Sequence, residues 1–335
     1  MSDAIVIKGV RKAFGQKVAV DDMDLVVPQG ALYGFIGPNG AGKTTTIRIV
    51  MSIIFPDRGE VSVLGKRSAV ESKDRIGYLP EERGLYRKMR VGPFLAFMAR
   101  LKGIDGPAAT RQVKEWLHRV GLADCFRKRC EELSKGMQQK VQFIAAVLHK
   151  PDLLILDEPF SGLDPVNRRL LRELIDEQHR AGRTIIFSTH AMYEAEQLCD
   201  HLVMINRGKK VLDIAMRDLW KRFDPRTVIV EPLEHHDGAS VAALSGIPGV
   251  AGAHETRTGF DLKLADDADP AAVMSSAAAR VRARRVELKR VSVEEVFIDL
   301  VQQSGGSGEE IAEIRSAIEQ ARAEAGAGVS SGEAG

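Results

Sequence analysis

Short apolar runs and helical spacing alternate along the chain, and together they predict an α/β fold. The runs are four to seven residues long and are bounded by polar, Gly or Pro residues, which is typical of buried strands. We expect strands at 4–8, 24–27, 31–36, 59–64, 75–79, 153–157 and 184–190. Pro28-Gln29-Gly30 marks the turn before the strand at 31–36.

Between about 91 and 150 the strand-like runs give way to helical periodicity. Leu95, Met98 and Ala99 fall on one expected helix face, and Val113, Trp116, Leu117 and Val120 fall on another. Ser134 has the character of an N-cap for an amphipathic helix running to about Lys150. A further helix is expected at about 167–181. The pattern therefore predicts a helical insertion between strands.

Past Trp220 the composition shifts towards Ala, Val, Arg and Asp, which indicates a second domain. We expect strands at 226–231, 250–255, 260–264 and 284–289, and helices at 239–244, 270–280 and 293–302. This predicts domains at 1–220 and 221–303, the second a small α+β domain without a catalytic cluster. His235-His236 is interpreted as a polar loop. In the tail at 304–335, a lone helix is expected at 309–325, with disorder beyond it.

Composition limits the possible partners and compartments. The chain has 335 residues and a net charge of +2, so nothing in its charge implies nucleic acid. Three cysteines, Cys125, Cys130 and Cys199, fit a reducing cytosol, and Cys125 and Cys130 lack the second ligand pair of a zinc site. We expect neither a secretory signal nor a membrane-spanning segment.

A glycine-rich turn follows the strand at 31–36 and leads into a helix. Its residues are Gly37, Pro38, Asn39, Gly40, Ala41, Gly42, Lys43, Thr44 and Thr45, which complete the Walker A pattern of a phosphate-binding loop. Glycines let backbone N–H groups converge on an anion, and the helix N-terminus adds its own donors. Lys43 is suited to the β- and γ-phosphates, and Thr44 to Mg²⁺.

Two acids end the buried strand at 153–157. Carboxyl ends of strands are where open α/β sheets bind ligands. Asp157 is suited to hold Mg²⁺, and Glu158 to polarise an attacking water. His190 ends the next strand, where a lone histidine is more often structural, although a γ-phosphate contact is plausible beside a phosphate site.

Five motifs in this order resemble the nucleotide-binding domain of the ATP-binding cassette (ABC) superfamily. They lie at 37–45, 133–137, 153–158, 161–164 and His190. The resemblance implies a P-loop NTPase fold with a helical insertion, and a head-to-tail dimer that holds ATP and Mg²⁺ between two copies. Ser134 and Gly136 would contact the γ-phosphate across the dimer, and Asp164 would link the two sites. His190 would contact the γ-phosphate, and Phe14 would stack on adenine.

The chain departs from the family pattern at two places. Lys135 and Met137 replace the third and fifth residues of the Leu-Ser-Gly-Gly-Gln signature. Glu81 stands where the family usually has a glutamine after Gly-Tyr-Leu-Pro, and its carboxylate is a possible Mg²⁺ ligand that cannot donate a hydrogen bond as an amide does. Both variants are similar to an exporter subgroup of the ABC-2 type, which includes sodium-efflux and drug-resistance systems.

Two classes of function fit a single ABC cassette. The first is the ATPase subunit of an exporter, acting on a separate membrane-spanning permease at the cytoplasmic face of the membrane, as a homodimer or a pseudo-symmetric heterodimer. The second is a soluble ABC ATPase that acts on ribosomes or DNA. Such proteins usually carry two cassettes, long coiled coils or zinc modules, and this chain has one cassette and no such insertion. We therefore favour the exporter subunit. A P-loop kinase outside the family is a distant third hypothesis, and the transported substrate cannot be inferred from this chain.

Overall fold

The computed structural model describes residues 2–82, 84–233, 238–304 and 307–326. The chain forms two compact units, Met1–Met216 with Phe297–Gly335 and Arg217–Val296. The predicted domain boundary at 220/221 and the assignment of 304–335 to a tail stay predictions. The predictions for His235-His236 and for the far end of the tail lie outside the described residues.

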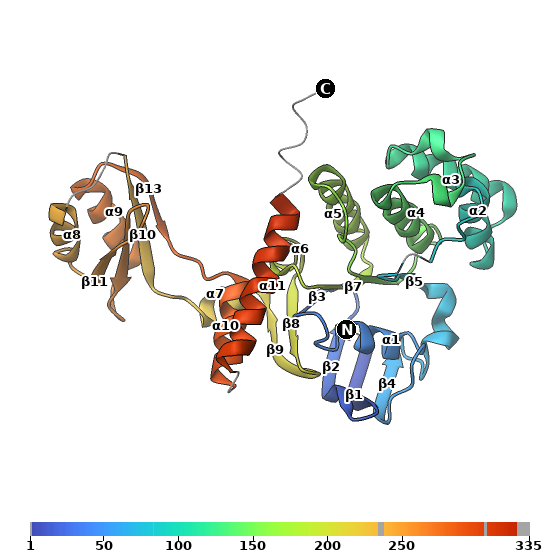
Figure 1. Ribbon diagram of the computed structural model, residues 1–335, viewed down its shortest axis with the longest axis horizontal. Helices are drawn as coiled ribbons and strands as arrows, with labels where there is room; N and C mark the ends of the chain where they lie inside the picture. Colours follow the sequence, from blue (N-terminus) through green and yellow to red (C-terminus); the bar gives the residue numbers. More distant parts are fainter. Residues whose placement is uncertain (1, 83, 234–237, 305–306, 327–335) are drawn as a thin grey trace. The chain divides into compact units, whose positions relative to one another are not determined.

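A six-stranded sheet forms the centre of the first unit (Figure 1). Its first five strands are parallel and the sixth pairs antiparallel with the fifth. In spatial order they are β5 (Ile76–Leu79), β6 (Leu153–Asp157), β7 (Thr184–Thr189), β3 (Leu32–Ile36), β8 (His201–Asn206) and β9 (Lys209–Ala215). The strands β3, β6 and β7 are buried throughout, which explains the apolar runs that they contain.

A second sheet in this unit is antiparallel and has three strands, in the order β2-β1-β4. These are β1 (Asp3–Phe14), β2 (Lys17–Pro28) and β4 (Arg58–Val63). The strands β1 and β2 form a hairpin in which Phe14 pairs with Lys17. Both strands are longer than the sequence pattern indicated, because β1 continues to Phe14 and β2 begins at Lys17, at the hairpin turn.

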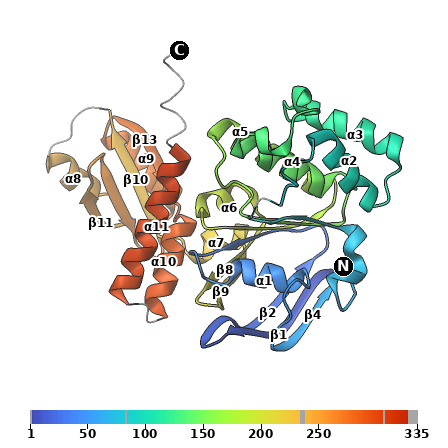
Figure 2. The same ribbon diagram turned by 45° about the vertical axis from the view of Figure 1, so that its right-hand side comes forward.

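Helices connect the parallel strands, and three of them form the predicted insertion. Figures 1 and 2 show α2, α3 and α4 grouped on the side of the parallel sheet away from β1, β2 and β4. The helices of this unit are α1 (Lys43–Val50), α2 (Val91–Leu101), α3 (Gly106–Arg119), α4 (Lys135–Val147), α5 (Pro165–Arg180), α6 (Met192–Leu198) and α11 (Gly308–Gly326), with short 3₁₀ turns at Ala69–Arg75, Ala123–Cys125 and Cys130–Glu132. Ser134 is the N-cap of α4 and accepts a hydrogen bond from the Met137 N–H, as predicted.

The second unit is a four-stranded antiparallel sheet with helices packed on it, so the predicted small α+β fold is confirmed. Its sheet order is β11-β12-β10-β13. The elements are β10 (Thr227–Pro232), α8 (Gly238–Ser245), β11 (Val250–Glu255), β12 (Phe260–Leu264), α9 (Pro270–Arg280) and β13 (Ala283–Leu288). Two helices, α7 (Met216–Arg222) and α10 (Val293–Gln303), span the boundaries of the units.

Candidate nucleotide-binding site

A hollow of about 330 Å³ opens beside the loop between β3 and α1. It is lined by the glycine-rich loop, by the β1–β2 hairpin and by two acids that follow β5 and β6. The lining residues are Phe14, Lys17, Ala19, Asn39, Gly40, Ala41, Gly42, Lys43, Thr44, Thr45, Glu81 and Glu158. The predicted phosphate loop, the predicted adenine contact and two predicted acids therefore share one hollow.

Two positions of the loop require glycine, because a Cβ atom there would clash with neighbouring backbone. A Cβ on Gly37 would lie 2.1 Å from the Ile205 carbonyl oxygen, and one on Gly42 would lie 2.4 Å from the Ala19 carbonyl oxygen. Gly42 also has a φ of 111°, which side chains with a Cβ rarely adopt. These contacts hold the loop close to β8 and β2, so the backbone itself forms the cradle.

Lys43 is the first residue of α1 and is almost fully buried. Its Nζ donates hydrogen bonds to the carbonyl oxygens of Gly37 at 2.7 Å and Pro38 at 3.1 Å, and lies 3.8 Å from Glu158 Oε1. Burial lowers the pKa of Lys43 from its usual value, against the opposing effect of the nearby acids. The ammonium group is therefore held over the loop in a site that is poorly solvated.

Asp157 ends β6 with a fully buried side chain. Its Oδ1 accepts hydrogen bonds from Thr44 Oγ1, at 3.1 Å, and from Ser188 Oγ. Its Oδ2 is buried and has no hydrogen-bond partner. Burial raises the pKa of Asp157, and the two hydroxyl groups partly offset this. An acid with one oxygen fixed and the other unpaired, next to a threonine hydroxyl, fits a Mg²⁺ site built from hard oxygen ligands.

Glu158 follows directly and has a φ of 47°, in the left-handed region. Its side chain is 7% exposed and lies between Lys43 and His190, whose Nδ1 is 3.0 Å from Glu158 Oε1. Because non-glycine residues pay a conformational penalty for this backbone geometry, a rigid surrounding must hold Glu158 there. The pairing of Glu158 with His190 was not predicted from the sequence.

Phe14 and Lys17 bring the β1–β2 hairpin into the site. Phe14 is 51% exposed, so its ring is open to a flat ligand, while Lys12 Nζ lies 5.6 Å from the ring centroid. Lys17 lines the same hollow and was missed, as was Ala19. The turn between Phe14 and Lys17 was the available signal, because a two-residue hairpin brings its flanking residues side by side.

Glu81 lies just beyond β5 and lines the hollow opposite the loop. Partial burial raises the pKa of Glu81, and the charges of Asp157 and Glu158 raise it further. The three carboxyl groups therefore repel one another electrostatically at this end of the sheet. A divalent cation would relieve their repulsion, so the Mg²⁺ role of Glu81 stays a prediction supported by charge.

The remaining predicted residues lie outside this hollow. Ser134 and Gly136 are at the N-terminus of α4, and a Cβ on Gly136 would lie 3.4 Å from Leu163 Cδ2. Asp164 is the N-cap of α5, where it accepts hydrogen bonds from the backbone N–H of Asn167, at 2.9 Å, and from its side-chain amide. Their predicted contacts with nucleotide across a dimer are not tested by a single chain and stay predictions.

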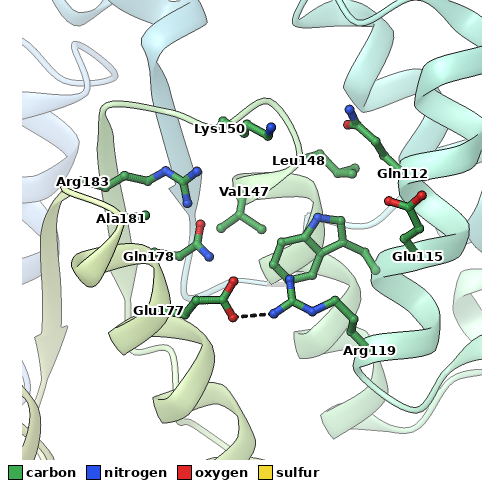
Figure 3. A pocket seen from close by; sticks show the side chains of 11 residues that line it. Gln112, Glu115, Arg119, Val147, Leu148, Lys150, Glu177, Gln178, Ala181 and Arg183 are labelled. Atoms are coloured by element: carbon green, nitrogen blue, oxygen red, sulfur yellow. Dashed lines mark hydrogen bonds and ion pairs between the residues drawn. The ribbon is translucent and has the colours of Figure 1, made fainter.

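A second cavity, of about 250 Å³, lies between the helical insertion and α5 (Figure 3). Arg119 of α3 donates a hydrogen bond across it to Glu177 of α5, and its guanidinium lies 4.4 Å from the Trp116 ring centroid. Lysine, arginine and glutamate side chains line it together, so it has no single charge preference. It shares no lining residue with the nucleotide hollow.

Within the described part of the chain, no helix is both long and apolar enough to span a bilayer. Across the same residues no group of three or more His, Cys, Asp or Glu side chains is arranged to hold a metal. The three cysteines are buried free thiols.

Comparison with known proteins gives a consistent result for both units. Residues 20–161 match the family described as ABC transporter, and residues 215–301 match the C-terminal domain of DrrA1-3-like ATP-binding proteins. The chain is 39% identical over 297 residues to the uncharacterized ABC transporter ATP-binding protein YhaQ of Bacillus subtilis, covering 89% of this chain and 98% of that protein.

Two further relatives extend the comparison. The linearmycin resistance ATP-binding protein LnrL of Bacillus subtilis is 31% identical over 294 residues, with 86% of this chain and 93% of LnrL covered. A solved structure of the ATP binding subunit of an ABC transporter aligns with a TM-score of 0.61 and 31% identity, covering 66% of this chain and 93% of that one.

Proposed function

Because this chain belongs to the ABC transporter family of ATP-binding proteins, we propose that it is the ATP-hydrolysing subunit of an exporter and drives a separate membrane-spanning permease. The DrrA-like match of the second unit and the resistance role in the name of LnrL support export. A soluble ABC ATPase acting on ribosomes or DNA is not favoured by these relatives. The proposal places the chain at the cytoplasmic face of the membrane, held there by its permease.

The observation that carries the proposal is the convergence of Lys43, Asp157, Glu158 and His190 at the carboxyl ends of three adjacent strands. Phosphoryl transfer requires positioned charges and a group that orients the attacking water, and these residues supply both. Thr44, Asp157 and Glu81 would hold Mg²⁺, which neutralises charge on the phosphate oxygens when bound.

The roles follow from the positions of the side chains. The ribose and phosphates of ATP would lie along the glycine-rich loop, with Phe14 against adenine and Lys43 on the β- and γ-phosphates. A water attacks the γ-phosphorus, the bond to the β–γ bridging oxygen breaks, and ADP and phosphate leave. Glu158 accepts a hydrogen bond from the water, and His190 holds the Glu158 carboxylate in place.

Two copies would complete the site. Ser134 and Gly136 lie outside the hollow of their own chain, so the α4 N-terminus is available to a nucleotide held by another copy. The donors of a helix N-terminus suit the γ-phosphate. We therefore include dimerisation, with a second copy or with a similar chain, in the proposed function.

Recovery of the tagged chain from detergent-solubilised membranes of its own host tests the proposal. We expect a multispanning membrane protein to co-purify and the reconstituted pair to hydrolyse ATP faster than the chain alone. The Lys43→Ala variant should bind the same protein but lose hydrolysis. A chain that hydrolyses ATP and is recovered only with ribosomes or DNA would contradict the export role.

A further inference from the structure

Ser188 has a hydroxyl group directly after the apolar run 185–187 of a strand at the centre of the parallel sheet. It lies in β7, next to β6, where it pairs with Asp157 across the two strands. The side chain is fully buried. Fully buried parallel strands are usually apolar, because a hydroxyl group there is costly unless it is hydrogen-bonded. The hydrogen-bond partners of the Ser188 hydroxyl group therefore indicate the role of this residue.

The Ser188 hydroxyl both donates and accepts a hydrogen bond, with Asp157 at the end of β6 and with Glu158 directly after it. Its proton is donated to Asp157 Oδ1, and its oxygen accepts the backbone N–H of Glu158 at 3.2 Å. The same N–H also lies 3.1 Å from the Ser188 carbonyl oxygen. One residue thus contacts the side chain of the first acid and the backbone of the second.

Each of the two hydrogen bonds of Ser188 fixes the position of an acid that the proposed ATP hydrolysis uses. On Asp157, the bonds from Ser188 and Thr44 both go to Oδ1, so the carboxylate is fixed with Oδ2 unpaired. On Glu158, the bond from the backbone N–H holds a residue whose φ is 47°. That backbone turn directs the Glu158 carboxylate towards His190 and Lys43.

We propose that Ser188 is a positioning residue for ATP hydrolysis, orienting Asp157 towards the metal site and holding the backbone of Glu158. The inference rests on the proposed ATPase function. The hydroxyl group of Ser188 bonds to Asp157 and to the backbone of Glu158, and neither bond involves the phosphate loop or His190, so the hydroxyl group acts through these two acids.

A set of three variants at this site tests the inference in the full chain. Ser188→Ala removes the hydroxyl group, Ser188→Thr retains it, and Ser188→Cys keeps the size with a weak donor. Thr184→Val is the matched control, because Thr184 is equally buried at the other end of β7 and its hydroxyl group accepts from the Gly30 N–H at 3.0 Å. Thermal unfolding of each variant records its stability.

The main readout is the dissociation constant of a fluorescent ATP analogue, measured with EDTA and with Mg²⁺. We expect the affinity of Ser188→Ala in EDTA to stay within about twofold of wild type. The Mg²⁺-dependent gain, which is the factor by which Mg²⁺ increases the affinity, should be about tenfold smaller, as for loss of a hydrogen bond to a charged group. The kcat of Ser188→Ala should fall about tenfold or more. Ser188→Thr should recover most of the Mg²⁺-dependent gain in affinity and most of kcat. Ser188→Cys should have values between those of Ser188→Ala and Ser188→Thr.

The outcomes separate the inference from the proposed function. If Ser188→Ala and Thr184→Val change both readouts only in proportion to lost stability, Ser188 has a purely structural role and the inference is wrong. The same holds if Ser188→Ala keeps the wild-type Mg²⁺-dependent gain and kcat. If Ser188→Ala does not fold, Ser188→Cys against Ser188→Thr decides by the same criteria. A wild-type chain with no Mg²⁺-dependent binding or hydrolysis would overturn the ATPase proposal, and the inference with it.

Discussion

The Nδ1 atom of His190 lies 3.0 Å from Oε1 of Glu158, so the residues that directly follow the neighbouring strands β7 and β6 meet. Lys43 Nζ is 3.8 Å from the same carboxylate oxygen. Glu158 is thus held between a lysine and a histidine on a strained backbone. This arrangement connects the acid that orients the water to both a phosphate-binding side chain and the neighbouring strand.

Replacement of Glu158 by glutamine should stop turnover while nucleotide binding is retained. The amide keeps the size of the side chain but loses the basic carboxylate, and a base in this role contributes about 10²–10⁴ in rate. We expect ATP affinity to change little and a stable ATP-bound dimer to accumulate in size-exclusion chromatography. Glu177→Gln, on exposed α5, is the matched control and should behave as wild type. An active, monomeric Glu158→Gln variant would exclude this role.

The Gly42→Ala variant should lose nucleotide binding because its new methyl group has no space. The Cβ would lie 2.4 Å from the Ala19 carbonyl oxygen, so the loop would have to move away from β2. Gly182→Ala is the control, since its φ of 84° gives a similar left-handed strain of about 1–2 kcal/mol without any atom within 4 Å. Calorimetric titration with ATP should show binding for Gly182→Ala and none for Gly42→Ala. Equal loss in both would assign the effect to backbone strain.

The phosphate loop and both acids could be proposed from the sequence, because backbone chemistry fixes residue types at fixed spacing there, and their roles stay predictions. Gly37 and Gly42 are required by close contacts with β8 and β2, and the acids come at the end of β6, a continuous apolar run. The pairing of Glu158 with His190 was not predictable, since it depends on strand order and on the unusual φ of Glu158.

The β8–β9 hairpin and two residues that line the nucleotide hollow were not predicted from the sequence. The hairpin of β8 and β9 was not predicted, because β9 is partly exposed and mixes lysine and aspartate with apolar residues. Lys17 and Ala19 were missed because their role depends on how the β1–β2 hairpin reaches the loop. Positions that act through long-range packing leave little local pattern in a sequence.

Glu194 should be essential for stability, since its carboxylate is fully buried between two arginines. Its oxygens lie 3.4 Å from Arg168 Nε and 2.7 Å from Arg172 Nη2, which ties α5 to α6. Glu194→Ala removes the carboxylate that pairs with both guanidinium groups, while Arg168 keeps its hydrogen bonds to Tyr193 and Leu163. The variant should lower the free energy of unfolding by about 3–5 kcal/mol. Glu173→Ala removes an exposed ion pair with Arg169 and should cost under about 1 kcal/mol. Urea unfolding of both variants measures the difference, and equal small losses would refute the prediction.

Asp164 should stabilise the first unit in a pH-dependent way as the N-cap of α5. The hydrogen bond from the Asn167 backbone N–H, with that from its side-chain amide, lowers the pKa of Asp164 below its usual value. Stabilisation by the charged form is therefore fully present above the unfolded-state pKa near 4 and is lost as the pH falls below it. We expect Asp164→Ala to cost about 1 kcal/mol at pH 7, as for other lost caps.

The pH series separates capping from other roles of Asp164. The difference in urea midpoint between wild type and Asp164→Ala should be the same at pH 7 and pH 5 and smaller at pH 3.5. Asp164→Asn should keep most of the stability at pH 7, because asparagine is an equally good N-cap. If Asp164→Asn is stable but loses the ATP-bound dimer of Glu158→Gln, the predicted link between two sites gains direct support. A midpoint difference that grows towards pH 3.5 would contradict the capping argument.

Glu81 should matter more for coupling to the permease than for the hydrolysis of ATP by the chain alone. It lies between the nucleotide hollow and the insertion, and Gln142 of α4 donates a hydrogen bond at 3.4 Å to the carbonyl oxygen of the adjacent Glu82. Burial raises the pKa of Glu81, and the charges of Asp157 and Glu158 raise it further. Glu81→Gln removes the charge, and with it this repulsion, while keeping the size of the side chain. We expect the permease-stimulated rate to fall several-fold more than the basal rate in proteoliposomes. Glu82→Gln, at an exposed neighbouring carboxylate, is the control and should change neither. Equal changes in both rates for Glu81→Gln would show that Glu81 acts only on the nucleotide.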